Sequence, residues 1–143
     1  MSKSVLCAVD INRPKDEKHI LEEAFRLAKM DNARLDVITV VPDYGMSVVG
    51  SYFDADHTKK VKEAVHNHLI EVTESVVGAE ANKEVRHIVS VGNAYEEILR
   101  TANKAGTDLI VIGAHKPDFR DFLLGPNAAR VVRHSTCSVY VVR

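Results

Sequence analysis

The sequence predicts an α/β domain with a doubly wound, five-stranded parallel sheet and helices on both faces. Five strand-sized apolar runs alternate with four stretches of helical periodicity, beginning and ending with a strand. The runs are almost continuously apolar and rich in valine and isoleucine, which is typical of strands covered on both faces. Strands that alternate with helices favour a parallel sheet with right-handed crossovers.

The predicted strands are short. They cover Val5–Val9, Leu35–Val41, Val85–Val91, Leu109–Ile112 and Val139–Val142. The fourth run is continuously apolar and the others are nearly so. The strict alternation of an antiparallel sheet with one wet face is therefore mostly absent.

The stretches between the strands place apolar residues three and four positions apart, as on one face of a helix. The first helix is predicted over about residues 16–30. The second ends at Gly78 and the third at Gly106, since glycine is a common helix C-cap. The fourth is short and is expected to begin near Pro126, because proline suits a first helical turn. The long segment from 42 to about 56 is expected to be a loop.

Composition and charge exclude several classes of function. The 143 residues contain no repeat or linker, so residues 1–143 are expected to form a single domain. The formal net charge is −1, which does not favour nucleic-acid binding. No apolar run is long enough for a membrane span, and nothing resembles an export signal. Two cysteines are too few for a disulfide framework, so a cytoplasmic protein with Cys7 and Cys137 as small apolar residues is expected.

The residues that follow the strands are the candidates for a binding site. In an open parallel sheet, ligands bind beyond the carboxyl ends of the strands, where the strand order reverses. Gly113 at such an end would let backbone approach a ligand. Gly125, just before a helix, would leave N–H groups free to bind phosphate. His115 and Lys116 would add positive charge, although ordinary turn chemistry explains the same residues equally well.

The chain resembles the universal stress proteins, and among them the short single-domain F/G-type branch. The resemblance rests on the opening strand with its acid (Val5–Asp10), the fourth strand with its glycine turn (Asp108–His115) and the stretch Leu123–Arg143. It implies a Rossmann-like fold of the adenine-nucleotide alpha hydrolase type, with strand order 3-2-1-4-5. It also implies an ATP-binding regulatory module of the stress response, which forms a homodimer through the last strand, Val139–Val142.

The resemblance also implies the roles of single residues. Asp10 would contact the ribose or adenine, and Val40 would hold the adenine through its backbone. The turn after the fourth strand and the start of the last helix would hold the phosphates. The expected ligand is ATP, or AMP or ADP, with or without Mg²⁺, and no catalytic residue is expected. The full expected set of nucleotide-binding residues is Ala8, Asp10, Val40, Ile112, Gly113, His115, Lys116, Gly125, Pro126, Asn127 and Ala128.

Two positions depart from the family's motif, G-x2-G-x9-G-[S/T]. Lys116 stands at the second glycine, where the F/G-type branch also carries a polar or basic residue. Pro126 replaces the Ser or Thr after the last glycine, which removes a hydroxyl and a backbone donor. Each lost hydrogen bond to a charged group is worth about 1.5–3 kcal/mol. Triphosphate is therefore expected to bind weakly or not at all, while the adenosine half of the site is retained.

Two other functions stay open. An unidentified regulatory protein is expected as the partner of the nucleotide-binding module. One of the two alternatives is a structural or interaction dimer that has lost its ligand, as Pro126 would allow. The other is a slow ATP hydrolase. Phosphoryl transfer usually needs a metal and a residue that orients the nucleophile. Asp10 and His115 are the only obvious candidates, so catalysis is the less favoured interpretation.

Overall fold

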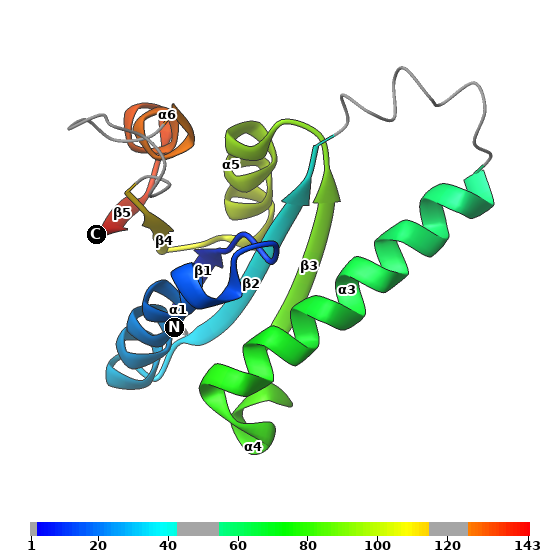
Figure 1. Ribbon diagram of the computed structural model, residues 1–143. Coiled ribbons are helices and arrows are strands. Elements are labelled where there is room, and N and C mark those ends of the chain that lie inside the picture. The colour runs from blue at the N-terminus through cyan, green and yellow to red at the C-terminus, as the bar shows by residue number, and fades with distance from the viewer. Residues whose placement is uncertain (1–2, 43–54, 115–125) are drawn as a thin grey trace.

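The computed structural model describes residues 3–42, 55–114 and 126–143. In these residues a five-stranded parallel sheet has the order β3-β2-β1-β4-β5. Helices cover both faces of the sheet (Figure 1). The predicted fold class and strand order are confirmed. Residues 43–54 of the expected loop lie outside the described residues, as do His115, Lys116 and Gly125.

The elements follow one another as the periodicity predicted, with strand ends within one residue of the expected ones. The strands are β1 (Ser4–Ala8), β2 (Arg34–Val41), β3 (Arg86–Val91), β4 (Leu109–Gly113) and β5 (Ser138–Val142). The helices are α1 (Pro14–Met30), α3 (Ala55–Val77), α4 (Ala79–Asn82), α5 (Ala94–Ala105) and α6 (Pro126–His134). The short α4 was not predicted, because a single turn leaves no periodic signal.

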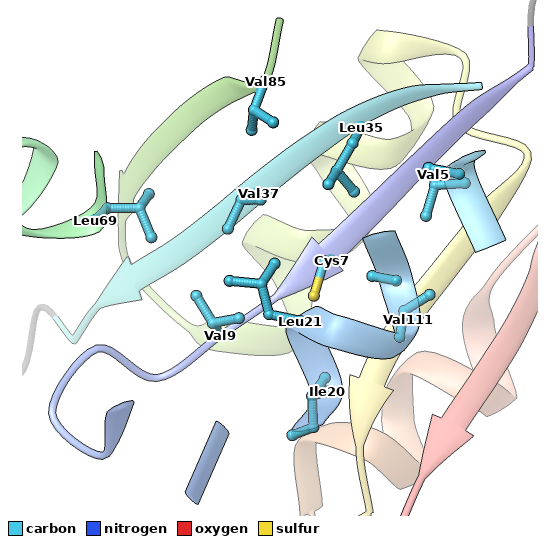
Figure 2. Packing of buried hydrophobic residues seen from close by; sticks show 12 residues of the cluster. Val5, Cys7, Val9, Ile20, Leu21, Leu35, Val37, Leu69, Val85 and Val111 are labelled. Atoms are coloured by element: carbon cyan, nitrogen blue, oxygen red, sulfur yellow. The ribbon is translucent and has the colours of Figure 1, made fainter. Parts of the chain in front are cut away.

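The sheet is buried on both faces by two separate apolar clusters. Under α1 and α3, Cys7, Leu21, Val37, Leu69 and Val111 are almost completely buried (Figure 2). Successive side chains of a strand point to opposite faces, so the central strands must be apolar at most positions. This double coverage explains the continuous apolar runs.

The opposite cluster lies under α5 and α6. It contains Leu6, Ile38, Ile98, Ile110 and Val131. Leu6 and Cys7 are neighbours in β1 and enter different clusters, as the alternation requires.

Two glycines end helices as expected. Gly106 has φ +67°, in the left-handed region, and its N–H caps the last turn of α5. Gly78 has φ +91° and donates its N–H to the Glu74 carbonyl at the end of α3. The chain then turns through α4 toward β3.

A histidine pair joins α3 to β3. The rings of His66 and His87 meet edge to face, with their centroids 6.3 Å apart. Nε2 of His87 lies 2.7 Å from Oδ1 of Asn82, whose amide nitrogen donates to the Ile70 carbonyl. Nε2 of His87 is therefore the donor in this bond. Burial, and then the charge of His66, lower the pKa of His87 below its ordinary value of 6.5.

The lowered pKa of His87 predicts a loss of stability in mild acid. The unfolded chain binds this proton near pH 6.5, whereas the folded chain binds it only at a lower pH. Between these two values the unfolded state holds more protons, so acidification favours unfolding. His87→Gln, which removes the titrating ring, is expected to flatten the fall in the free energy of unfolding below pH 6.5 in urea titrations.

The matched control is His68→Gln, because His68 is exposed on the same helix as His66. This variant is expected to keep the pH profile of the parent protein. Identical profiles for the His87 variant and the parent would show that the pair does not sense acid.

Candidate functional site at the switch point of the sheet

Strands β1 and β4 run side by side only as far as the pair Cys7–Val111. Beyond this pair, β1 stays with β2. Ala8 is paired with Ile38, and the N–H of Val9 donates to the Ile38 carbonyl at 2.9 Å. The end of β1 thus turns away from β4.

Strand β4 stays with β5 on the other side. Gly113 is paired with Val142, and the N–H of Ala114 donates to the Val142 carbonyl at 2.8 Å. The two central strands therefore part at the point where the strand order reverses, which is where open parallel sheets bind ligands. We call the space between Ala8–Asp10 and Ile112–Ala114 the β1–β4 split.

A carboxylate from α1 reaches both sides of the β1–β4 split. Since the N–H of Val9 points toward β2, the next N–H, that of Asp10, points toward the split. It donates to Oε1 of Glu17 at 2.9 Å. Oε2 of Glu17 lies 3.5 Å from the position that a Cβ on Gly113 would occupy. Glu17 thus takes the backbone donor that a continuing β4 would have paired.

Sequence reasoning missed Glu17. The signal was present, because Glu17 lies three, four and seven positions before the buried residues Ile20, Leu21 and Ala24. It therefore belongs to the apolar stripe of α1. The first turn of a helix that follows a strand lies near the end of the sheet. An acidic residue on the apolar stripe of that turn is therefore expected to face the end of the sheet.

Burial is the main reason that the pKa of Glu17 lies above its ordinary value. The carboxylates of Asp10 and Asp16 raise it further, whereas the Asp10 N–H and His19 lower it. The buried Cys7 thiol has a raised pKa, first because of burial and then because of Glu17. Cys7 is thus a neutral, buried small residue, as predicted.

Asp10 lies at the mouth of the β1–β4 split. Its Oδ1 accepts the N–H of Asn12 at 3.0 Å, and its carbonyl accepts the N–H of Arg13 at 3.1 Å. These bonds form the turn that leads into α1. Val40 lies near the end of β2, half-buried against the α5–α6 side of the sheet.

The structure gives a packing reason for a glycine at position 113. A Cβ at this position would lie 2.5 Å from Cδ1 of Ile20, which is buried. Close packing of α1 on β4 therefore requires the glycine, whether or not a ligand approaches its backbone.

The remaining described candidates lie on the α6 side. Helix α6 begins at Pro126, as predicted, with Pro126 and Asn127 exposed and Ala128 buried. The first turn of a helix leaves N–H groups without partners inside the helix, so the backbones of Asn127 and Ala128 can serve an anion. The side chains of Ala8 and Ile112 are buried in the core, so only their backbones can contribute to a site.

Two features are absent from residues 3–42, 55–114 and 126–143. There, no helix is both long enough and apolar enough to cross a membrane. The same residues contain no group of three or more His, Cys, Asp or Glu side chains that could hold a metal ion.

Comparison with known proteins decides the family. The model of the universal stress protein family matches residues 1–143. This chain belongs to the universal stress protein family. Universal stress protein G of Escherichia coli O157:H7 is 26% identical in an alignment that covers 100% of both chains.

Solved structures share the fold of this universal stress protein. MJ0577 of Methanocaldococcus jannaschii has a TM-score of 0.78 at 23% identity, over 99% of this chain and 96% of that one. A universal stress protein in complex with cAMP has a TM-score of 0.67 at 17% identity, over 99% and 97% of the two chains. The Archaeoglobus fulgidus protein in complex with dAMP has a TM-score of 0.64 at 17% identity, over 99% and 98%.

Gly113→Ala is expected to destabilise the protein by about 1–3 kcal/mol, because the new methyl group overpacks a closed contact. Ile20→Val removes Cδ1, the atom that clashes, and by itself costs about 0.5–1.5 kcal/mol. The double variant is expected to be more stable than the sum of the two single effects. Chemical denaturation of the four proteins measures this coupling, and strict additivity would contradict the packing explanation.

Proposed function

We propose that this universal stress protein binds an adenine nucleotide in the β1–β4 split and acts as a nucleotide-responsive regulatory module. The observation that carries the proposal is the parting of β1 and β4 beyond Cys7–Val111, with Asp10 on one side and Gly113 on the other. Membership of the family supports it, as do the family complexes with cAMP and dAMP.

The described residues suit the adenosine part of such a ligand better than its phosphates. Asp10 offers a carboxylate to ribose hydroxyls, and the end of β2 at Val40 offers backbone to the adenine edge. The phosphates would meet the helix start at Asn127 and Ala128. Among the described residues, Asp10 and Glu17 bring carboxylates to the split, and these do not favour a triphosphate. Mg²⁺ would offset part of that charge.

The regulatory action follows from two-state thermodynamics. A ligand shifts a conformational equilibrium only by the difference in its affinity for the two states. A nucleotide that contacts both sides of the β1–β4 split would favour one arrangement of the surrounding segments. A regulatory protein that recognises that arrangement would read the nucleotide state.

Position 126 also supports a second function, a dimer of this family that no longer binds nucleotide. Pro126 opens α6 without a donor at the first helical position. Two variants separate the effects of the lost groups. Pro126→Ala restores the backbone N–H, and Pro126→Ser restores the N–H together with a hydroxyl.

Titration calorimetry with adenosine, AMP, ADP and ATP tests both functions. The parent protein is expected to bind adenosine and AMP more tightly than ATP. Pro126→Ser is expected to raise the ATP affinity roughly tenfold or more, with Pro126→Ala between the two, as each restored hydrogen bond strengthens binding. Binding by the serine variant alone would assign the natural chain to the non-binding dimer. Absence of any adenylate binding in all three proteins would contradict the proposal.

We also infer that two chains pair through β5. This strand forms the end of the sheet, and no other strand of the described residues pairs with its outer side. Tyr140 on β5 is 38% exposed. Open edges of sheets are usually covered or paired, and a symmetric copy of Val139–Val142 would cover this one.

Sedimentation at micromolar concentration is expected to show a dimer that Tyr140→Asp weakens, because the substitution places a charge on the pairing strand. The matched control is Val132→Asp, since Val132 is a similarly exposed apolar residue on α6. A monomeric parent protein, or equal effects of the two substitutions, would contradict pairing through β5.

A further inference from the structure

Glu17 is the feature of the β1–β4 split that ordinary nucleotide binding does not explain. The side chain is half-buried and acidic, and it bonds to the Asp10 N–H at the split where the proposed ligand would bind. One of its oxygens accepts the Asp10 N–H, and the other lies 3.5 Å from the position that a Cβ on Gly113 would occupy. A phosphate next to the Gly113 backbone would thus meet a carboxylate at close range.

Among the described residues, carboxylates predominate among the charges that act on Glu17. On α1, Asp16 adds negative charge, and His19 acts in the opposite direction. On β1 and the turn after it, Asp10 is a second carboxylate and Cys7 is a neutral thiol. On β4, the position of a Cβ on Gly113 would lie 3.5 Å from Oε2 of Glu17. A phosphate that binds beside these carboxylates would add a further negative charge.

We propose that Glu17 sets the charge of the ligand that the β1–β4 split accepts: a ligand that places phosphate there binds with Glu17 protonated, whereas uncharged adenosine binds without a proton. This inference rests on the proposed function, because it needs an adenylate in the split. Two like charges about 5 Å apart at an effective dielectric constant of about 20 weaken binding roughly a hundredfold. Taking up one proton at the carboxylate removes that repulsion.

Several properties suit Glu17 to this role. Burial already favours its neutral form, so protonation requires less free energy than at an exposed glutamate. Protonation leaves one oxygen able to accept the Asp10 N–H, while the other can donate to a phosphate oxygen. The backbone turn at Asp10 is thus preserved while the site changes from repelling to binding an anion.

Proton uptake by the parent protein is the direct test. Binding is measured by calorimetry at pH 7.5, with EDTA, in buffers of different ionisation enthalpy. The ligands are adenosine and cAMP, a phosphodiester whose single charge does not titrate in this range. The expected result is a measurable net uptake of protons for cAMP and an uptake near zero for adenosine. Binding of cAMP without proton uptake would overturn the proposal.

A neutral variant tests the same point through affinity. Glu17→Gln keeps an oxygen for the Asp10 N–H and cannot be charged. It is expected to bind cAMP roughly tenfold more tightly or better at pH 7.5, with no proton uptake, and to bind adenosine nearly as the parent does. If this variant does not fold, the proton uptake of the parent protein decides alone.

The matched control is Glu97→Gln. Glu97 is also half-buried beside a glycine at a strand end, with Cγ 3.3 Å from the position of a Cβ on Gly92. It lies in the first turn of α5, which follows the edge strand β3, and is paired with Arg100 at 2.6 Å. The control is expected to leave the affinities and the proton uptake unchanged. If the two substitutions change the affinities and the proton uptake equally, Glu17 affects binding only through the overall structure, and the proposal is overturned.

Two further outcomes are distinguishable. If Mg²⁺ in place of EDTA tightens ATP binding in the parent and not in Glu17→Gln, Glu17 acts through a cation and the proton mechanism is wrong. If neither adenosine nor cAMP binds to any of the three proteins, the proposed function fails together with the inference. Binding without proton uptake removes the inference alone.

Discussion

The parting of β1 and β4 is the feature on which the rest of this structure depends. Right-handed crossovers carry α1 to one face of the sheet and α5 to the other, so the chain winds outward from the centre in two directions. The central strands can then stay paired only along their shared length, which ends at Cys7–Val111. The backbone groups beyond that pair must find other partners, and they define the candidate site.

Helix α1 determines what the backbone groups beyond Cys7–Val111 contact. Its buried stripe brings Ile20 so close to β4 that only glycine fits at position 113. One turn earlier, the same stripe carries Glu17 to the Asp10 N–H. The packing of one helix therefore sets both the shape and the charge of the β1–β4 split. A residue selected for packing and a residue suited to ligand charge lie on the same face, three positions apart.

This arrangement relates the local chemistry to the family. Universal stress proteins share the sheet and its switch point, and solved members hold cAMP and dAMP. In this chain a proline opens α6, and a carboxylate lies in the split. Under the proposed function, both features would act against a highly charged phosphate chain and would leave the adenosine half of the proposed site unaffected. The two act by different means, since one removes a donor and the other adds a negative charge.

The sequence by itself determined the number, order and ends of the strands, because burial on both faces requires continuous apolar runs such as Leu109–Ile112. It also indicated that one helix ends at Gly106 and another begins at Pro126, since backbone conformation at both positions depends on the local residue type. Only the tertiary structure decided that Glu17 enters the split, that Gly113 is required by Ile20 and that His66 meets His87. These contacts join residues on different elements, and periodicity shows which face of an element is buried but not what the opposite element places against it.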